Sequence, residues 1–529
     1  MFRATKKAFF ISAVYLFELY ILLKAWFNHY ERMFCGCAIW LVLTTLFFLL
    51  AYAYQKNRNT SVLSMTRKQN VCLGAIITLC VLASTLPMNL SPYWNGEIPD
   101  HRNQYEAITE SLLNGHLHFD YEADPRLLAL ENPYDPQQRY ESGVQYHWDH
   151  ALYNGKYYMY FGIVPVFMAF LPFRLLTGHP LTTYHATQLF TGLIIVSFFA
   201  LFYLLSKVFF RRMSFSRYVA LSVSFSLLSI WYSVGFPAMY CTAITAAILL
   251  ILWSLYLFIH AVWGKHSENT RIAYAFGGAL CGALSFGCRP PIALANLLVI
   301  PMLVVYLRKF PLNLKRFAQL FLAASPYFVV ACLLMLYNYA RFDNPFEFGQ
   351  TYQITIADQT HYGGLPSLNA WSGILQSAFD NFFTRPTFRA FGGIFANFPI
   401  LLLSFGLLVP HTWRSLKDHQ LLGVGCCLLV LPVIITLVDV MWSPILLTRY
   451  QLDVYFLLTL LCFIVVGTQE TKGAGVGFVL DSAIFMLSLF TIATCIWFFC
   501  IPYDYNWSAT YYPELLDRLI PLLSLGIFR

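Results

Sequence analysis

Two carboxylates and three arginines stand at the ends of long apolar runs in this sequence of 529 residues, where side chains can meet a polar substrate. They are Glu97, Asp100, Arg289, Arg341 and Arg449. A carboxylate can accept the proton of an attacking hydroxyl. Arginines can take up the charge that develops on a leaving phosphate. The set suits sugar transfer from a lipid-linked phosphosugar, with Asp100 or Glu97 as the base and the arginines on the donor phosphate.

Four neighbours of these candidates are assigned to substrate binding because they lie beside them in the chain. They are His101, Arg102, Tyr105 and Tyr450.

Each candidate also has a purely structural explanation. Asp100 can cap a helix that carries apolar side chains at helical spacing as far as Leu113, and Glu97 can be a solvated loop charge. Arg289 and Arg449 can be interfacial anchors whose side chains extend to lipid headgroups.

A metal site is a further possibility, because His147, Asp149 and His150 follow one another closely. Three polar residues in a hydrated loop are more often only that. We therefore expect no cofactor, and a divalent metal is the alternative.

Composition identifies the environment of these residues. The chain is 58% hydrophobic and 11% charged, with a mean hydropathy of +0.59. A soluble protein would carry about a quarter charged residues. The net charge of +8 comes from short basic clusters between apolar runs, which is typical of cytoplasmic loops in a membrane protein rather than of nucleic-acid binding.

The apolar runs predict an all-α polytopic protein of the cell membrane with about 13 transmembrane helices. The candidate spans are 8–27, 33–53, 71–88, 185–206, 216–236, 239–263, 272–288, 291–307, 316–338, 390–410, 420–438, 450–467 and 474–500. The basic clusters fall on one side if the N-terminus is cytoplasmic, which leaves the C-terminus outside. The predicted parts are two N-terminal helices in 1–70, a core in 71–470 and a last helix with its tail in 471–529.

The large polar loop, residues 89–156, is expected to face outward and to be folded. Residues 89–155 hold eleven acidic residues and three basic ones. We expect residues 157–176 to form a helix along the outer interface, because a span there would put the basic cluster 207–217 outside. The alternative is a kinked span. The outward region then covers 89–184, and a second outer loop covers 339–389.

Five segments together resemble the GT-C fold glycosyltransferases. The segments are DHRNQYEAITESLLNGH, NGKYYMYFGIVPVFMAFLPFRLLTGHPLTTYHATQL, FGCRPPIALANLLVIP, YNYARFDNPFEFGQTYQ and TRYQLDVYFLL, within roughly 71–470. They are similar to that family's first outer loop, juxtamembrane helix, bacterial "R-P" helix end, late outer loop and "RY" span start. The resemblance implies a sugar donor on polyprenyl phosphate, inverting transfer at the outer membrane face, and a catalytic carboxylate that maps to Asp100.

The chain also departs from that family's common pattern. Many members carry two adjacent acidic residues directly after the span, whereas Ile98 and Pro99 separate Glu97 from Asp100 here. The choice of base therefore stays open between the two carboxylates. Two additional spans precede the one that leads into the loop.

The predicted function is a membrane glycosyltransferase that transfers a sugar to a cell-surface glycan, lipid or protein, with no nucleic-acid partner. One alternative is a surface-polysaccharide polymerase or ligase, which usually has its large polar loop late in the chain. The other is a transporter of lipid-linked glycans, which would show broken helices, charges at mid-membrane and an internal repeat.

Overall fold

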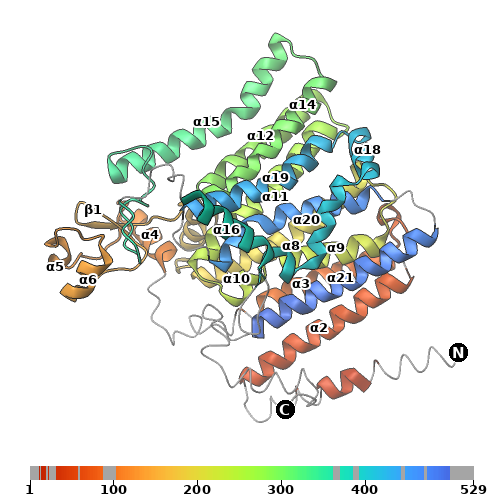
Figure 1. Cartoon of the computed structure of the whole chain (residues 1–529), viewed down its shortest axis with the longest axis horizontal. Coiled ribbons are helices and arrows are strands. Elements are labelled where there is room, and N and C mark those ends of the chain that lie inside the picture. The colour runs from red at the N-terminus through yellow and green to blue at the C-terminus, as the bar shows by residue number, and fades with distance from the viewer. Residues whose placement is uncertain are drawn as a thin grey trace.

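The apolar runs of the sequence become helices in the computed structural model of the protein (Figure 1). The structure describes residues 11, 13–19, 22, 31–56, 60–86, 88, 103–360, 370–384, 392–442, 447–469 and 474–500. Among these residues, eight helices are long and apolar enough to cross a membrane. The other five predicted spans fall on the partly described 8–27, on α2, α9 and α12, and on the short η5, so the count of about 13 stays a prediction.

The helices of the apolar body follow one another in chain order. They are α2 (Glu31–Lys56), η1 (Val62–Ser64), α3 (Arg67–Thr85), α8 (Thr183–Val208), α9 (Phe215–Leu228), α10 (Trp231–Gly235), α11 (Met239–Trp263), α12 (Glu268–Phe286), α13 (Pro290–Ala293), η4 (Leu294–Leu298), α14 (Val299–Lys309), α15 (Leu314–Phe342), α16 (Ala370–Phe383), α17 (Ile394–Asn397), η5 (Pro399–Leu408), α18 (Pro410–Asp418), α19 (Leu422–Trp442), η6 (Thr448–Gln451), α20 (Leu452–Gly467) and α21 (Ala474–Cys500).

Burial separates the centre of this body from its edge. α11 packs between α8 and α12, α20 packs on α19, and α15 packs on α12 alone among its major helix contacts. In the apolar window that contains α20, 94% of the residues are buried, whereas the figure for α15 is 17%. Figure 1 shows α15 leaning away from the other helices at the edge of the molecule. α20 is therefore a central helix, and α15 presents most of its apolar surface outward.

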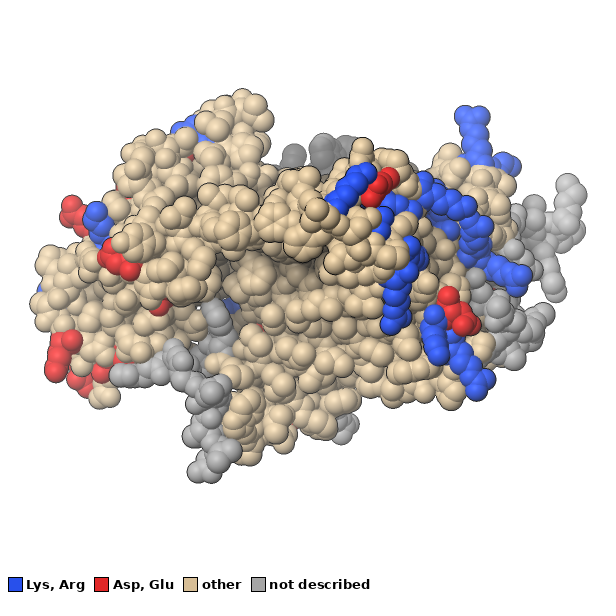
Figure 2. Space-filling model, turned by 90° about the horizontal axis from the view of Figure 1, so that it is seen from above, with Lys and Arg blue, Asp and Glu red and all other residues tan. Residues whose placement is uncertain are grey.

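Charged side chains gather at opposite ends of the body. Figure 2 shows Lys and Arg over the end that holds the α14–α15 connection, and most of the visible Asp and Glu over the end that holds the polar loop. The basic clusters thus gather at one end of the helices, and which end faces the cytoplasm stays a prediction.

The polar loop is folded from short elements. They are α4 (Gln104–Leu113), α5 (Pro125–Leu128), α6 (Pro136–Ser142), β1 (Ala151–Tyr153) and β2 (Lys156–Tyr158), followed by η3 (Val166–Phe170) and α7 (Leu171–Thr177). β1 and β2 pair antiparallel with Ala151 opposite Tyr158. Asn154 and Gly155 both have positive φ, 48° and 74°, as a two-residue hairpin turn of this sequence requires.

The two polar loops, within 89–156 and 339–389, are joined by backbone hydrogen bonds. The Leu152 amide donates to the Tyr352 carbonyl and the Ile354 amide donates to the His150 carbonyl, both at 2.9 Å. The guanidinium of Arg139 is buried and donates to the carbonyls of Pro133 and Thr355, one in each loop. Together these bonds make one polar subdomain from segments about 200 residues apart in the chain.

Two expectations for the first outer region need correction. The helix expected after Asp100 begins at Gln104, with Asn103 at the N-cap position, so Asp100 does not cap it. The segment 157–176 is helical only from Val164, because Tyr157 and Tyr158 belong to β2 and the next five residues are irregular. The helix Val166–Thr177 has 12 residues, and at about 1.5 Å per residue it is too short for a membrane core of about 30 Å.

Candidate functional site

A cleft opens where α15 ends, beside the junction of α12 with α13. Its cavity volume is about 70 Å³, and its lining includes three of the predicted site residues, Arg289, Arg341 and Tyr450. Asp439 of α19 and the segment after β2 complete the lining. The structure thus brings together residues that are up to 290 positions apart in the sequence, as the difference between Tyr450 and Tyr160 gives.

A close backbone contact fixes the floor of the cleft. The Val164 amide donates to the Gly287 carbonyl at 2.8 Å. A Cβ atom added to Gly162 would lie 2.2 Å from the same carbonyl oxygen, so only glycine fits there. The end of α12 and the segment after β2 are therefore joined directly, two residues before Arg289.

Arg289 is held by carboxylates. Its Nε lies 2.7 Å and 2.9 Å from the two carboxylate oxygens of Asp453, and its Nη2 lies 2.6 Å from one of them. Asp439 lies 4.0 Å from the same guanidinium. Asp453 is completely buried and Asp439 nearly so. One cation thus faces two buried carboxylates, and its charge is already balanced within the protein.

Arg341 lines the same cleft without such compensation. It is 4% exposed, and it donates to the Met159 carbonyl and to Asn338 Oδ1 at 2.8 Å. Its guanidinium carbon lies 3.9 Å from the ring centre of Tyr337. Among the described residues, no carboxylate lies within 4.0 Å of it and its Nε has no hydrogen-bond partner. Arg341 is thus a buried cation beside the cleft with one unpaired, buried donor, which makes it a candidate group for binding an anion.

Arg449 is held by aromatic rings rather than by acids. Its guanidinium carbon lies 3.9 Å from the ring centre of Tyr240 and 5.3 Å from that of Tyr450. The guanidinium carbon of Arg289 also lies over the Tyr450 ring, 5.0 Å from its centre. Stacking on aromatic faces holds a guanidinium in place while its edge stays available for hydrogen bonds.

Asp149 connects this cationic group to the polar subdomain. The Tyr240 hydroxyl donates to one carboxylate oxygen of Asp149, and the Gln353 side chain donates to the other at 3.0 Å. Gln104, at the start of α4, donates to the Asp149 carbonyl at 2.9 Å. Asp149 is 6% exposed and has a left-handed backbone with φ of 57°. These bonds hold an acidic side chain close to Arg449.

The neighbouring His150 is buried in a ring of aromatic side chains. Burial lowers the pKa of its imidazole from 6.5 to about 4. Its Nδ1 donates to the Trp148 carbonyl at 2.8 Å, because a carbonyl oxygen can only accept. His150 is therefore neutral near pH 7, as a packed structural histidine is.

Tyr105 lies in α4 and faces the same region. Its ring is fully buried and stacked on Phe170, with centroids 5.2 Å apart. Its hydroxyl has no hydrogen-bond partner among the described residues, and burial raises its pKa. Arg289 and Tyr337 of the cleft act on it electrostatically.

The acidic candidates lie outside the described residues. These are Glu97 and Asp100, together with the predicted substrate-binding residues His101 and Arg102. Their proposed roles therefore stay predictions. The next described residue is Asn103. Gln104 then contacts Asp149, which lies beside Arg449.

Three acids, Asp149, Asp439 and Asp453, were not predicted to belong to the site. Asp453 lies in an apolar run four residues after Arg449, and an unpaired carboxylate there would be costly, so its position alone signals a buried partner. Asp149 was considered only as a metal ligand with His147 and His150. Its actual partners are Tyr240 and Gln353, from segments that no local pattern connects with it.

Comparisons with known proteins give little guidance. No protein-family model matches the sequence, and no curated protein sequence matches it. Among solved structures, the chain is similar to the oligosaccharyltransferase of Archaeoglobus fulgidus, crystallised with a tethered acceptor peptide that contains the NVT sequon, with 10% identity and a TM-score of 0.35. The match covers 79% of this chain and 55% of the archaeal chain, so this chain matches only about half the length of that enzyme.

Proposed function

We propose that the protein is a GT-C-type membrane glycosyltransferase that takes a sugar from a polyprenyl-phosphate donor and transfers it to a cell-surface glycan, lipid or protein. Arg341 carries the proposal. It is a buried arginine in a cleft, with a free donor and no carboxylate within 4.0 Å among the described residues. A phosphate is the anion that a planar guanidinium binds well.

The surface of α15 supports a lipid as the carrier of that phosphate. The helix that ends at Arg341 exposes Phe321, Phe328, Leu333 and Leu336, each at least 60% accessible. These apolar side chains suit contact with hydrocarbon. A donor can therefore place its chain along α15 and its phosphate at the cleft.

The chemical step needs a base and a stabilised leaving group. In the proposed mechanism Asp100, or Glu97 in its place, accepts the proton of the acceptor hydroxyl as that oxygen attacks the anomeric carbon. The bond from the sugar to the phosphate breaks, and Arg341 and Arg449 stabilise the lipid phosphate that leaves. Arg289 then has a supporting role, because Asp453 already balances its charge. Direct displacement inverts the anomeric configuration.

Reconstitution tests this proposal. The purified protein is placed in liposomes with radiolabelled polyprenyl-phosphate sugars and an extract of candidate acceptors, and new glycosidic bonds are measured. Asp100→Asn is expected to abolish transfer while donor binding persists. Transfer at the wild-type rate by the folded Asp100→Asn variant removes Asp100 as the base, and Glu97→Gln then tests the alternative.

The same assay separates the alternative functions. A polymerase or ligase would give products that lengthen or join whole glycans rather than gain one sugar. A transporter would move labelled donor across the bilayer without any new glycosidic bond, and that result would overturn the proposed enzyme activity.

A further inference from the structure

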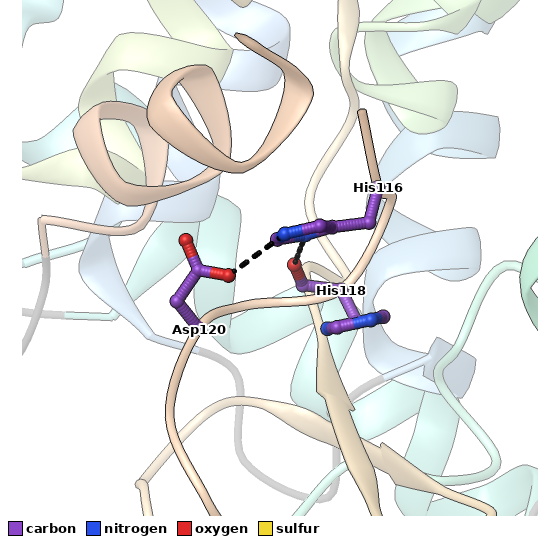
Figure 3. A group of neighbouring side chains, drawn as sticks. All are labelled: His116, His118 and Asp120. Atoms are coloured by element: carbon purple, nitrogen blue, oxygen red, sulfur yellow. Dashed lines mark hydrogen bonds and ion pairs between the residues drawn. The ribbon is translucent and has the colours of Figure 1, made fainter. Parts of the chain in front are cut away.

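A group of three side chains lies at the end of α4, outside the cleft. Figure 3 shows the rings of His116 and His118 parallel to one another, with Asp120 facing His116. The ring centroids are 4.5 Å apart, and His116 Nε2 lies 3.0 Å from Asp120 Oδ1. One ligand atom from each of the three residues lies within 4.8 Å of the others.

The hydrogen bonds of the two rings fix which nitrogen carries the proton. His116 Nδ1 lies 3.2 Å from the His118 carbonyl, and His118 Nδ1 lies 3.0 Å from the Phe119 carbonyl. A carbonyl oxygen only accepts, so both Nδ1 atoms are donors. In a neutral ring the lone pair is then on Nε2. Histidines that bind metals are commonly oriented in this way, with the other ring nitrogen donating to a backbone carbonyl.

The carboxylate beside His116 favours a cation at this position. With its lone pair on Nε2, a neutral His116 faces a carboxylate oxygen at 3.0 Å. The contact is resolved either by the other tautomer, whose Nε2–H donates to Asp120, or by a metal ion between the two groups. Asp120 is itself oriented by Asn114, whose side-chain amide donates to the second carboxylate oxygen at 3.2 Å. A carboxylate and two imidazoles are a common ligand set for Zn²⁺.

We propose that His116, His118 and Asp120 bind a Zn²⁺ ion, with water as the fourth ligand. Ligands about 2.0–2.1 Å from a tetrahedral zinc are about 3.3 Å apart. The His116–Asp120 contact is already close to that spacing, and His118 has to move by about 1.5 Å. His118 is only partly buried, so a rotation of its ring, which gives up the contact of its Nδ1 with the Phe119 carbonyl, can supply the movement.

The ion would close a turn that links two parts of the polar subdomain. Gly115, with φ of 87°, ends α4 just before the site. On the other side, the Phe119 amide donates to the Tyr157 carbonyl of β2 at 2.9 Å. A zinc ion between these points would fix the end of α4 against the hairpin. The site goes beyond the proposed transfer reaction and does not depend on it.

The test is metal binding by the full-length protein in detergent after chelator treatment and dialysis. Zn²⁺ is titrated against a chromophoric chelator, and Co²⁺ is added separately to record its visible absorption. We expect one equivalent of Zn²⁺ and the intense visible bands of four-coordinate Co²⁺. His118→Ala and Asp120→Asn should each lower the Zn²⁺ affinity at least tenfold, whereas His179→Ala, in an exposed loop, should leave it unchanged.

Asp120→Asn preserves the shape of the site, so its result does not depend on a large change in folding. The proposal is wrong if the wild-type protein binds no equivalent of Zn²⁺, or if Asp120→Asn and His118→Ala both bind it as tightly as the wild type. Since neither readout measures glycosyl transfer, failure here leaves the proposed function untouched.

Discussion

The two sides of the cleft differ in how they hold positive charge. On the α20 side, Arg289 is bound by Asp453 at 2.6 Å. Asp453 belongs to α20, and 94% of the residues in the apolar stretch that contains this helix are buried. On the α15 side, Arg341 has no carboxylate within 4.0 Å among the described residues. Only 17% of the residues in the apolar stretch of its helix are buried. The same residue type thus has a structural role where it pairs with the central helix and an unpaired donor on the peripheral one. Sequence position alone would have made the two arginines equivalent.

The largest expected effect comes from breaking the compensated side. Asp453→Asn leaves Arg289 buried without its closest carboxylate, which should cost about 3–5 kcal/mol of stability. Thermal unfolding in detergent measures the loss. Replacing all three charged groups, Arg289→Met with Asp453→Leu and Asp439→Leu, should recover most of it because no charge is then left unpaired. An Asp453→Asn protein as stable as the wild type would contradict the paired role.

Acid should act on the polar subdomain without changing the arginines, which stay charged at every accessible pH. Burial lowers the pKa of His150 from 6.5 to about 4. The unfolded chain then binds more protons than the folded one between these values, so stability rises with pH across that window. The loss on acidification should reach about 3 kcal/mol below pH 4.

His150→Phe provides the control for the acid effect. It keeps an aromatic ring at the site but has no group that titrates, so its unfolding temperature should vary less between pH 6.5 and 4. An unchanged pH profile in this variant would assign the effect to other groups.

The uncompensated side should control activity more than stability. Arg341→Ala removes a guanidinium that is proposed to bind the donor phosphate, and transfer should fall about 100-fold, as for loss of one charge-stabilising donor. The matched control is Arg126→Ala, whose guanidinium is 64% exposed and paired with Asp124. Equal activity in the two variants would remove Arg341 from the donor site.

The smallest effect is expected at the opposite end of the body. Glu268 forms exposed ion pairs, 3.4 Å from Lys315 and 3.7 Å from Arg316. Exposed pairs of this kind contribute about 0–1 kcal/mol. Glu268→Gln should therefore shift the unfolding temperature little. A loss of stability as large as that of Asp453→Asn would show that burial does not explain why the Arg289–Asp453 pair contributes more than an exposed pair.

The periodic parts of the structure were predictable from sequence. Long apolar runs gave the positions of the helices, and α4 followed from the spacing of Tyr105 and Ile108, both fully buried. Its start was placed too early, since Asn103 rather than Asp100 precedes the first turn. Local patterns carry helix positions well because they depend on neighbouring residues, but they define the ends poorly.

The pairing within the site was not predictable, because it depends on segments distant in the chain. Arg289 and Asp453 are 164 residues apart, and Asp149 meets Gln353 across 204. The prediction of one helix over 157–176 was wrong for a related reason. Its apolar residues fit a helix equally well, and the choice of a strand at Tyr157 depends on the Asn154–Gly155 turn and on the partner strand β1.

The contact between Gly162 and Gly287 has a mechanical consequence. It joins the polar subdomain to the end of α12, and the space between the two glycines does not hold even a methyl group. Arg289 follows Gly287 by two residues. The subdomain therefore cannot swing over the cleft as a lid without carrying Arg289 and its carboxylates with it.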